Sequence, residues 1–205
     1  MSNGGSLVAT GGQGRKPEVV VWDPATLITA CRLEAAELNG KRAVKALCFS
    51  PDDGLVVAAC DDNDHTLLCF SVATGGLVDS AKGGVERIMA LAWAPEALGG
   101  GLVSAGVKHF VLWPGSGGLG RPLSGGKAQK GLFGNAGRTT LSSACFAGSK
   151  GGGNCFTGSA TGAVYAWLGR QCCGVIDAHG KGCPVFSVVA AHAVGRPDIL
   201  ATVRA

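Results

Sequence analysis

The sequence has 205 residues, a mass of 20.5 kDa and a formal net charge of +4, which leaves room for one sizeable domain or two small ones. Hydrophobic residues make up 46% of the chain and charged residues 16%, so the composition excludes a disordered protein. The 35 glycines are clustered rather than placed at every third position, which excludes collagen. The apolar runs are strand-sized, and residues 1–6 lack the features of a secretory signal. We therefore expect a soluble, cytoplasmic protein.

The nine cysteines are odd in number, and most stand singly inside apolar stretches such as residues 46–49 and 67–70. This pattern is typical of small buried hydrophobic side chains in a reducing compartment rather than of a disulfide framework.

Short runs of β-branched, aromatic and small apolar residues alternate with clusters of Gly, Asp, Asn and Pro, which indicates an all-β chain. The first unit, residues 7–40, is partial. Its strands at 7–11 and 18–22 have no inner strand ahead of them, and the second strand ends in the dipeptide Trp22-Asp23 that gives WD repeats their name.

Three complete units follow, each with an inner strand, a second strand and a third strand that ends in an aromatic residue. The units are 41–83, 84–135 and 136–180, with inner strands 44–50, 88–94 and 141–147, second strands 55–60, 102–105 and 155–159, and third strands 66–70, 109–113 and 163–167. Trp22, Phe70, Trp113 and Trp167 are separated by 48, 43 and 54 residues, close to the ~40–45 of WD repeats with loop insertions.

The last unit, residues 181–205, is again partial, with an inner strand at 183–189 and a second strand at 198–203. Ala178-His179 ahead of it matches the histidine that opens a WD blade. Thr161 stands where an Asp usually bonds this histidine.

A four-stranded unit is too small to cover both of its own faces, so neighbouring units must stack around an axis. The sequence therefore predicts a WD-repeat β-propeller with about three complete blades and partial blades at both ends. Because propellers close with about 4–8 blades, we expect a piece of a longer protein whose remaining blades complete the ring. Trp22, Trp113 and Trp167 should be equivalent positions that pack between blades.

Several segments resemble one family in particular, the echinoderm microtubule-associated protein-like proteins, whose body is a pair of joined WD propellers. The similar segments are residues 104–113, with their glycine, lysine, histidine and aromatic-tryptophan strand, the short insertion 130–134, the acidic turn 60–65, and the blade opening at Ala178-His179 with Val185-Phe186. The likeness runs from about Leu7 to Val189.

The resemblance implies a non-catalytic scaffold on microtubules or other cytoskeletal proteins, including those of the ciliary axoneme. The family's hydrophobic motif ahead of the first propeller and its coiled coil are missing, and the glycine runs 99–101 and 151–153 depart from its pattern.

Two apparent chemical motifs have simpler explanations. Cys172, Cys173, His179 and Cys183 fall within twelve positions, but they lack the paired arms of structural zinc sites, and adjacent strand residues point to opposite faces. Residues 115–120 satisfy G-x-G-x-x-G, yet Arg121-Pro122 follows where a dinucleotide-binding helix should begin. Each histidine, at 65, 109, 179 and 192, has a structural explanation at a strand or blade boundary. We expect no catalytic residue, cofactor or metal.

Basic residues in predicted loops are the candidate partner-binding positions. They are Arg15, Lys16, Lys41, Arg42, Lys127 and Lys130, with Arg138 and Lys150 beside them. They either form an ordinary solvated surface or face the acidic exterior of a microtubule, where contacts would weaken with salt. No aromatic residues interleave them, which disfavours nucleic-acid binding. The alternatives are a generic WD scaffold without tubulin binding and, from the enzyme class, a nucleotide-binding or hydrolytic protein.

Overall fold

A computed structural model describes residues 1–33, 36–95, 101–115, 121–147, 154–191 and 199–204. In these residues seventeen strands form five antiparallel sheets, numbered here from first to fifth in chain order. The all-β prediction is confirmed. The two described helices are single 3-10 turns, η1 (Ala36–Leu38) and η3 (Gly134–Ala136). Among the described residues, no helix has the length and hydrophobicity needed to cross a membrane.

The strands follow the order of the chain within every sheet. The first sheet contains β1 (Val8–Gly11), β2 (Val19–Trp22) and β3 (Thr29–Leu33). The second contains β4 (Val44–Phe49), β5 (Leu55–Cys60), β6 (Leu67–Ser71) and β7 (Leu77–Ala81). The third contains β8 (Ile88–Trp93), β9 (Leu102–Gly106), β10 (His109–Trp113) and β11 (Gln129–Lys130). The fourth contains β12 (Leu141–Ala147), β13 (Asn154–Ser159), β14 (Ala163–Leu168) and β15 (Gln171–Asp177), and the fifth β16 (Val185–Ala191) and β17 (Ile199–Arg204).

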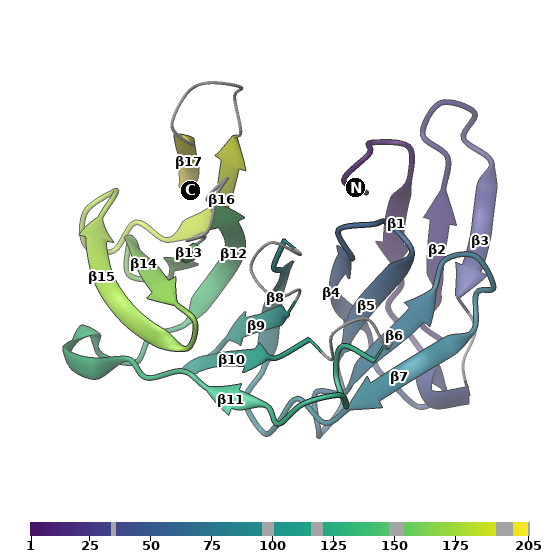
Figure 1. Cartoon of the computed structure of the whole chain (residues 1–205), viewed down its shortest axis with the longest axis horizontal. Helices are drawn as coiled ribbons and strands as arrows, with labels where there is room; N and C mark the ends of the chain where they lie inside the picture. The colour runs from purple at the N-terminus through teal and green to yellow at the C-terminus, as the bar shows by residue number, and fades with distance from the viewer. Residues whose placement is uncertain (34–35, 96–100, 116–120, 148–153, 192–198, 205) are drawn as a thin grey trace.

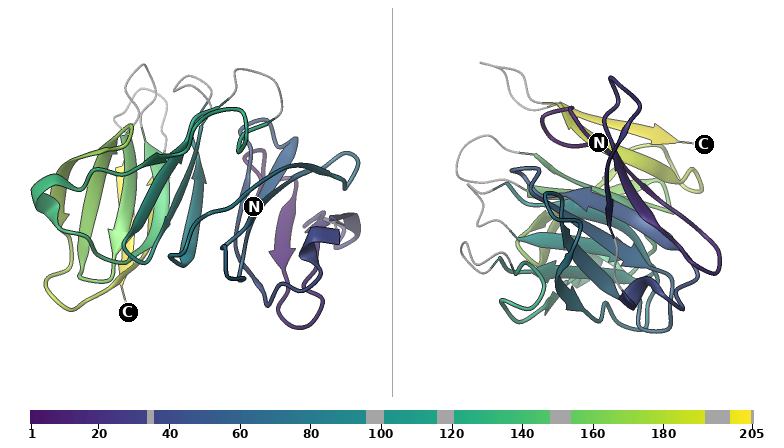
Figure 2. Two further views of the ribbon diagram at one scale, coloured as in Figure 1. Left: turned by 90° about the horizontal axis from the view of Figure 1, so that it is seen from below. Right: turned by 90° about the vertical axis from the view of Figure 1, so that its right-hand side faces the viewer.

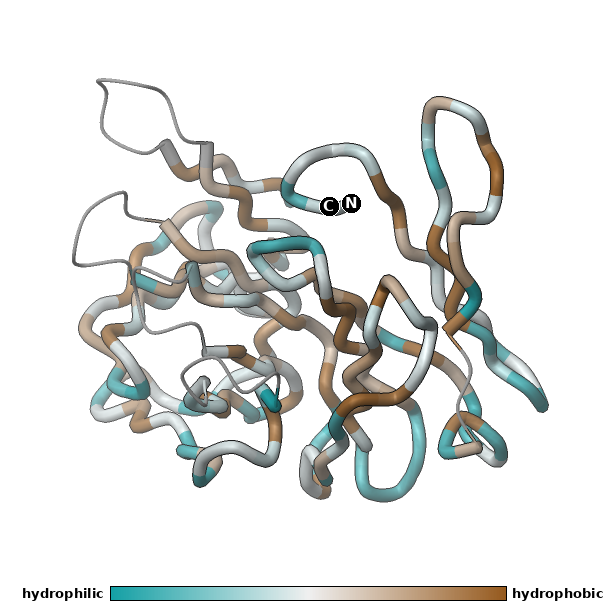
Figure 3. The backbone as a smooth tube through the Cα atoms, turned by 45° about the vertical axis from the view of Figure 1, so that its right-hand side comes forward, coloured by the Kyte–Doolittle hydropathy of each residue, from teal (hydrophilic) through white to brown (hydrophobic). Residues whose placement is uncertain are grey.

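The sheets stand side by side in an open arc, with the first sheet at one end and β16–β17 at the other (Figures 1 and 2). Hydrophobic residues run along the strands, whereas many connecting loops are hydrophilic (Figure 3). This distribution is expected of sheets whose two faces are both covered by neighbours.

Alternation along the strands divides the core into layers between sheets. In β5, Val56 and Ala58 pack toward the first sheet, whereas Val57 and Ala59 pack toward the third. Because successive side chains point to opposite faces, one apolar run supplies two hydrophobic layers. Four such layers join the five sheets.

Each inner strand also carries a register shift at the same place, just after its first residue. The shift lies at Val44/Ala46, Ile88/Ala90, Leu141/Ser143 and Val185/Ser187. Bulges at fixed positions re-aim side chains and bend a strand. The repeat that the sequence predicts is therefore also a repeat of backbone geometry.

Candidate interaction face

Antiparallel order places alternate loops at opposite ends of the sheets. Two sets of loops lie at the same end, which we call the front face, and the remaining loops form the back face. The first set links second strands to third strands and consists of residues 12–18, 61–66, 107–108 and 160–162. The second set leads into inner strands and consists of residues 36–43, 82–87, 131–140 and 178–184.

Backbone hydrogen bonds join the two sets of front-face loops across sheet boundaries. The N–H of Gly14 donates to the carbonyl of Arg42 at 2.9 Å, and that of Gly84 donates to the carbonyl of Asp64 at 3.0 Å. The N–H of Lys108 donates to the carbonyl of Thr139 at 3.1 Å. The front face is therefore a set of interlocked loops rather than of separate hairpins.

Lys41, a predicted partner-binding cation, is held inside this network. Its ammonium pairs with Asp62 and donates to the Thr66 hydroxyl at 3.1 Å, and both charged side chains are more than four-fifths buried. Asp62 also accepts hydrogen bonds from the Thr66 N–H and hydroxyl. Burial opposes charging Asp62, but the hydrogen bonds from Lys41 and Thr66 outweigh it and lower its pKa. Lys41 is thus committed to the fold and has little charge to offer a partner.

Arg42 is the second predicted cation whose charge is compensated. Its guanidinium donates to Asp61 at 3.0 Å, and Lys45 lies 3.7 Å from the other oxygen of the same carboxylate. Arg42, Asp61 and Arg87 line a shallow polar pocket of about 580 Å³. Its wall carries mixed charges, so it has no single strong electrostatic preference.

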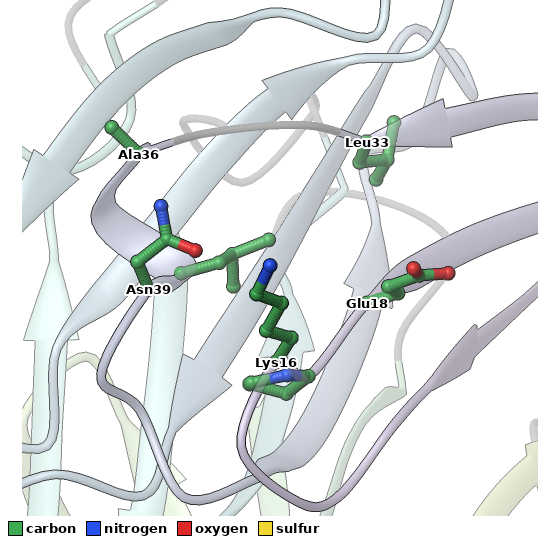
Figure 4. Close-up of a pocket in the computed structure, with 7 residues that line it drawn as sticks. Lys16, Glu18, Leu33, Ala36 and Asn39 are labelled. Atoms are coloured by element: carbon green, nitrogen blue, oxygen red, sulfur yellow. The ribbon is translucent and has the colours of Figure 1, made fainter.

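Arg15 and Lys16 differ from this pair. Both are exposed, and neither forms an ion pair with a described residue. Lys16 lies at the edge of a pocket of about 520 Å³, together with Glu18, Leu33 and Asn39 (Figure 4). Leu33, Ala36 and Leu38 contribute the apolar part of the lining, and Leu38 is buried. This part of the front face combines available positive charge with a hollow.

The other basic candidates do not gather with these two. Lys127 is exposed on a back-face loop, and Lys130 is exposed on β11 at the outer edge of the third sheet. Arg138 is on the front face, with its guanidinium 5.9 Å from the centre of the Phe133 ring. Lys150 lies outside the described residues.

The predicted aromatic positions occupy one register. Each of the three tryptophans pairs with a residue of the neighbouring second strand. Its indole N–H donates to the hydroxyl of the residue that lies two positions after that pairing partner. The acceptors are Thr10, Ser104 and Thr157, at 2.8, 3.0 and 2.9 Å. In the second sheet the corresponding pair is Ala58 and Phe70, both fully buried.

Burial separates Trp22 from the other two tryptophans. Trp113 and Trp167 are almost fully buried toward the preceding sheet, and Trp167 stacks on Phe110 with centroids 3.8 Å apart. Trp22 is only half-buried, because no described sheet covers that side of the first sheet. Trp113 and Trp167 pack between described sheets, and the packing of Trp22 between blades stays a prediction.

Two histidines form hydrogen bonds with hydroxyl groups at equivalent positions of two different sheets. His109 is buried, and its Nε2 lies 2.9 Å from the Ser104 hydroxyl that also accepts the Trp113 indole N–H. Burial lowers the pKa of His109 to about 4, so its imidazole is neutral at pH 7. In the fifth sheet, His179 lies 2.8 Å from the hydroxyl of Thr202, the residue equivalent to Ser104. His109 is thus part of a buried polar network with Ser104 and Trp113, whereas His179 connects the loop after β15 to β17 through Thr202.

Asp23 and the cysteines likewise have structural positions. Asp23 accepts hydrogen bonds from the N–H groups of Ala25 and Thr26, of which the bond from Ala25 contributes most to lowering its pKa. All nine cysteines are free thiols. The described residues contain no group of three or more His, Cys, Asp or Glu able to hold a metal ion. Residues 116–120 of the G-x-G-x-x-G run lie outside the described residues, as do His192, Gly99, Gly100 and the run 151–153.

One contact between sheets has no signal in the sequence. Asp79 of β7 is 8% exposed, and its carboxylate accepts the N–H groups of Leu123 and Ser124, both at 2.9 Å. These residues belong to the insertion before β11, so an outer strand of the second sheet holds a loop of the third. A single Asp in a polar strand end gives no indication of a partner 44 residues away.

Comparisons with known proteins agree with this geometry. No protein-family model matches the sequence. The chain is 35% identical over 183 residues to the ciliary WD repeat-containing protein ctxp80 of Euplotoides octocarinatus, an alignment that covers 89% of this chain and 24% of that protein. The chain thus spans about a quarter of the length of this curated relative. Among solved structures, the Cps50 (Swd1) β-propeller domain of Myceliophteria thermophila superimposes with a TM-score of 0.66 at 11% identity, over 89% of this chain and 55% of that one. The sheets are therefore those of a WD-repeat β-propeller.

Proposed function

We propose that this chain is a non-enzymatic WD-repeat scaffold that binds tubulin or another acidic cytoskeletal protein through the front face. The observation that carries the proposal is the availability of Arg15 and Lys16, which are exposed and without an ion pair among the described residues. The ciliary WD relative and the resemblance to echinoderm microtubule-associated protein-like proteins support a partner in the cilium or on microtubules.

Charge on the described front face is predominantly positive once the ion pairs are set aside. Exposed cations without an ion pair among the described residues are Arg15, Lys16, Arg87, Lys108, Arg138 and Lys181, against the acidic residues Glu37, Glu86 and Asp177. Such a surface attracts an acidic partner and accelerates encounter, an effect that salt screens beyond a Debye length of about 8 Å near physiological ionic strength.

Microtubule co-sedimentation tests the proposal. The double variant Arg15→Glu/Lys16→Glu should pellet several-fold less than the unaltered chain, and binding of both should fall as salt rises. Lys127→Glu on the back face is the matched control and should pellet like the unaltered chain.

Equal pelleting of the front-face and back-face variants would contradict the proposal for this face. If the unaltered chain fails to pellet with microtubules at every salt concentration, the second candidate is favoured, which is a WD scaffold for partners other than tubulin. The fold itself leaves that choice open.

A further inference from the structure

The pocket beside Lys16 lies between one loop of each front-face set. Residues 16–18 come from the loop between β1 and β2, whereas Ala36, Leu38 and Asn39 come from the segment that leads into β4. With a volume of about 520 Å³, the pocket has room for a side chain of a partner.

Main-chain hydrogen bonds hold these two segments together. The N–H of Gly14 donates to the carbonyl of Arg42 at 2.9 Å, and the N–H of Val44 donates to the carbonyl of Gly12 at 2.9 Å. The pocket is therefore formed before a partner arrives. Binding then does not have to order these loops, which lowers its entropic cost.

Two polar side chains of the lining have free hydrogen-bonding groups. Neither the ammonium group of Lys16 nor the side-chain amide of Asn39 bonds to a described residue. The Lys16 side chain points toward Asn39 (Figure 4). The N–H of Asn39 donates to the carbonyl of Ala36 at 3.0 Å, which fixes the backbone from which the amide projects. The ammonium and the amide can therefore both donate to one carboxylate.

Glu18 also lines the pocket, but its charge is compensated. Its carboxylate forms an ion pair with the guanidinium of Arg32 at 2.7 Å, and it points away from Lys16 in Figure 4. Lys16 is therefore the charged group of the described lining that has no counter-charge. Arg15 adds a second cation next to the pocket without lining it. This balance of charge favours an anionic occupant.

Apolar side chains form the rest of the lining. Leu33 and Leu38 are only 2% and 6% exposed, whereas Ala36 is exposed. A carboxylate on a short aliphatic stem fits this combination, because the stem contacts apolar atoms while the carboxylate reaches Lys16 and Asn39. Glutamate has two methylene groups for such contacts, and aspartate has one.

We propose that this pocket, which we call the Lys16 pocket, binds a glutamate side chain in an acidic segment of the partner protein. This assignment rests on the proposed function, because it names the group by which the front face recognises its acidic partner. The Lys16 ammonium and the Asn39 amide donate to the carboxylate, and the two methylene groups pack against Leu33, Ala36 and Leu38. Exposed cations alone would attract any acidic group, whereas the Lys16 pocket prefers glutamate to aspartate.

Hexaglutamate and hexaaspartate peptides test this preference, because they carry the same charge and differ by one methylene group in each side chain. Both are labelled with fluorescein and titrated with the unaltered chain while fluorescence anisotropy is measured. Hexaglutamate should bind about fourfold more tightly, which is the effect of one buried methylene group. Equal affinity for the two peptides, or no binding of hexaglutamate, would overturn the proposal.

A first pair of variants separates the Lys16 pocket from general electrostatic attraction. Lys16→Met and Arg15→Met each remove one positive charge, but only Lys16 lines the pocket. Lys16→Met should weaken hexaglutamate binding about tenfold, because it removes a charge-assisted hydrogen bond. Arg15→Met should weaken it by less than about threefold, as expected of an exposed charge. Equal losses from the two variants would overturn the proposal.

A second pair of variants fills the pocket without changing its charge. Ala36→Trp should weaken hexaglutamate binding about tenfold, because the indole occupies the space of the glutamate stem. Ala25→Trp, in the turn between β2 and β3 on the back face, is the matched control and should bind like the unaltered chain. Both alanines are exposed, so circular dichroism melts should show unchanged unfolding midpoints. Equal binding by the two variants would overturn the proposal.

Microtubule pelleting distinguishes failure of the Lys16 pocket from failure of the proposed function. If Ala36→Trp reduces pelleting as Arg15→Glu/Lys16→Glu does, while Ala25→Trp does not, the Lys16 pocket is supported. If the double charge variant reduces pelleting but Ala36→Trp does not, the front face binds its acidic partner without this pocket. The proposed function then stands, and the assignment of the Lys16 pocket is overturned.

Discussion

Replacing Trp167 by Phe and Thr157 by Ala would give the fourth sheet the pair that the second sheet already has in Phe70 and Ala58. Trp167 and Thr157 are both fully buried and share one hydrogen bond of 2.9 Å. Each single variant leaves the other polar group unpaired inside the core, at a cost of about 1–3 kcal/mol. Trp167→Phe also loses contacts with Phe110 and Phe133, worth about 1–2 kcal/mol more.

The double variant removes donor and acceptor together, so its cost should be about 1–2 kcal/mol less than the sum of the two single costs. Urea unfolding of the four proteins, followed by circular dichroism, measures this coupling free energy. The pair Trp22→Phe and Thr10→Ala is the matched control. Water reaches that half-exposed site and replaces the lost bond, so its coupling should be below about 0.5 kcal/mol. Single costs that add within 0.5 kcal/mol at Thr157 and Trp167 would refute the reasoning.

Three further predictions concern charged and titratable groups. The pKa of His109 is about 4 in the folded chain and has an ordinary value of 6.5, so the unfolded chain binds a proton at higher pH than the folded chain does. The free energy of unfolding should therefore fall by up to about 3 kcal/mol as the pH drops from 6.5 toward 4. Urea titrations at pH 7 and pH 5 should show that His109→Gln lacks this pH-dependent loss. Lys41→Glu should lower the free energy of unfolding by about 2–4 kcal/mol, because it places a second carboxylate beside Asp62. Thermal melts measure the effect, with the exposed Arg15→Glu as the control. Similar unfolding midpoints for these two variants would show that the Lys41–Asp62 pair contributes little. Asp79→Ala should cost about 1–3 kcal/mol and accelerate hydrogen exchange at the amides of Leu123 and Ser124, whereas unchanged exchange there would mean that the insertion is held by other contacts.

The sequence by itself determined the inner, second and third strands, the repeat and the equivalent positions of the tryptophans, but it predicted no residue ranges for the fourth strands β3, β7, β11 and β15. Alternation of apolar residues is a local property of each strand, and the spacing of Trp22, Phe70, Trp113 and Trp167 follows directly from residue counts. The bulges that recur in the inner strands are seen only in the structure, because no residue type marks them.

Only the tertiary structure decided which basic residues are available. Lys41 and Arg42 look like Arg15 and Lys16 in the sequence, as adjacent cations in loops. Lys41 and Arg42 form ion pairs with Asp62 and Asp61 in a facing loop of the second sheet, whereas Arg15 and Lys16 form none with a described residue. Trp22 and Trp167 likewise share a motif and a hydrogen bond but differ in burial, because burial depends on the neighbouring sheet. Ion pairing and burial depend on segments far apart in the chain, and local patterns carry no information about which segments meet.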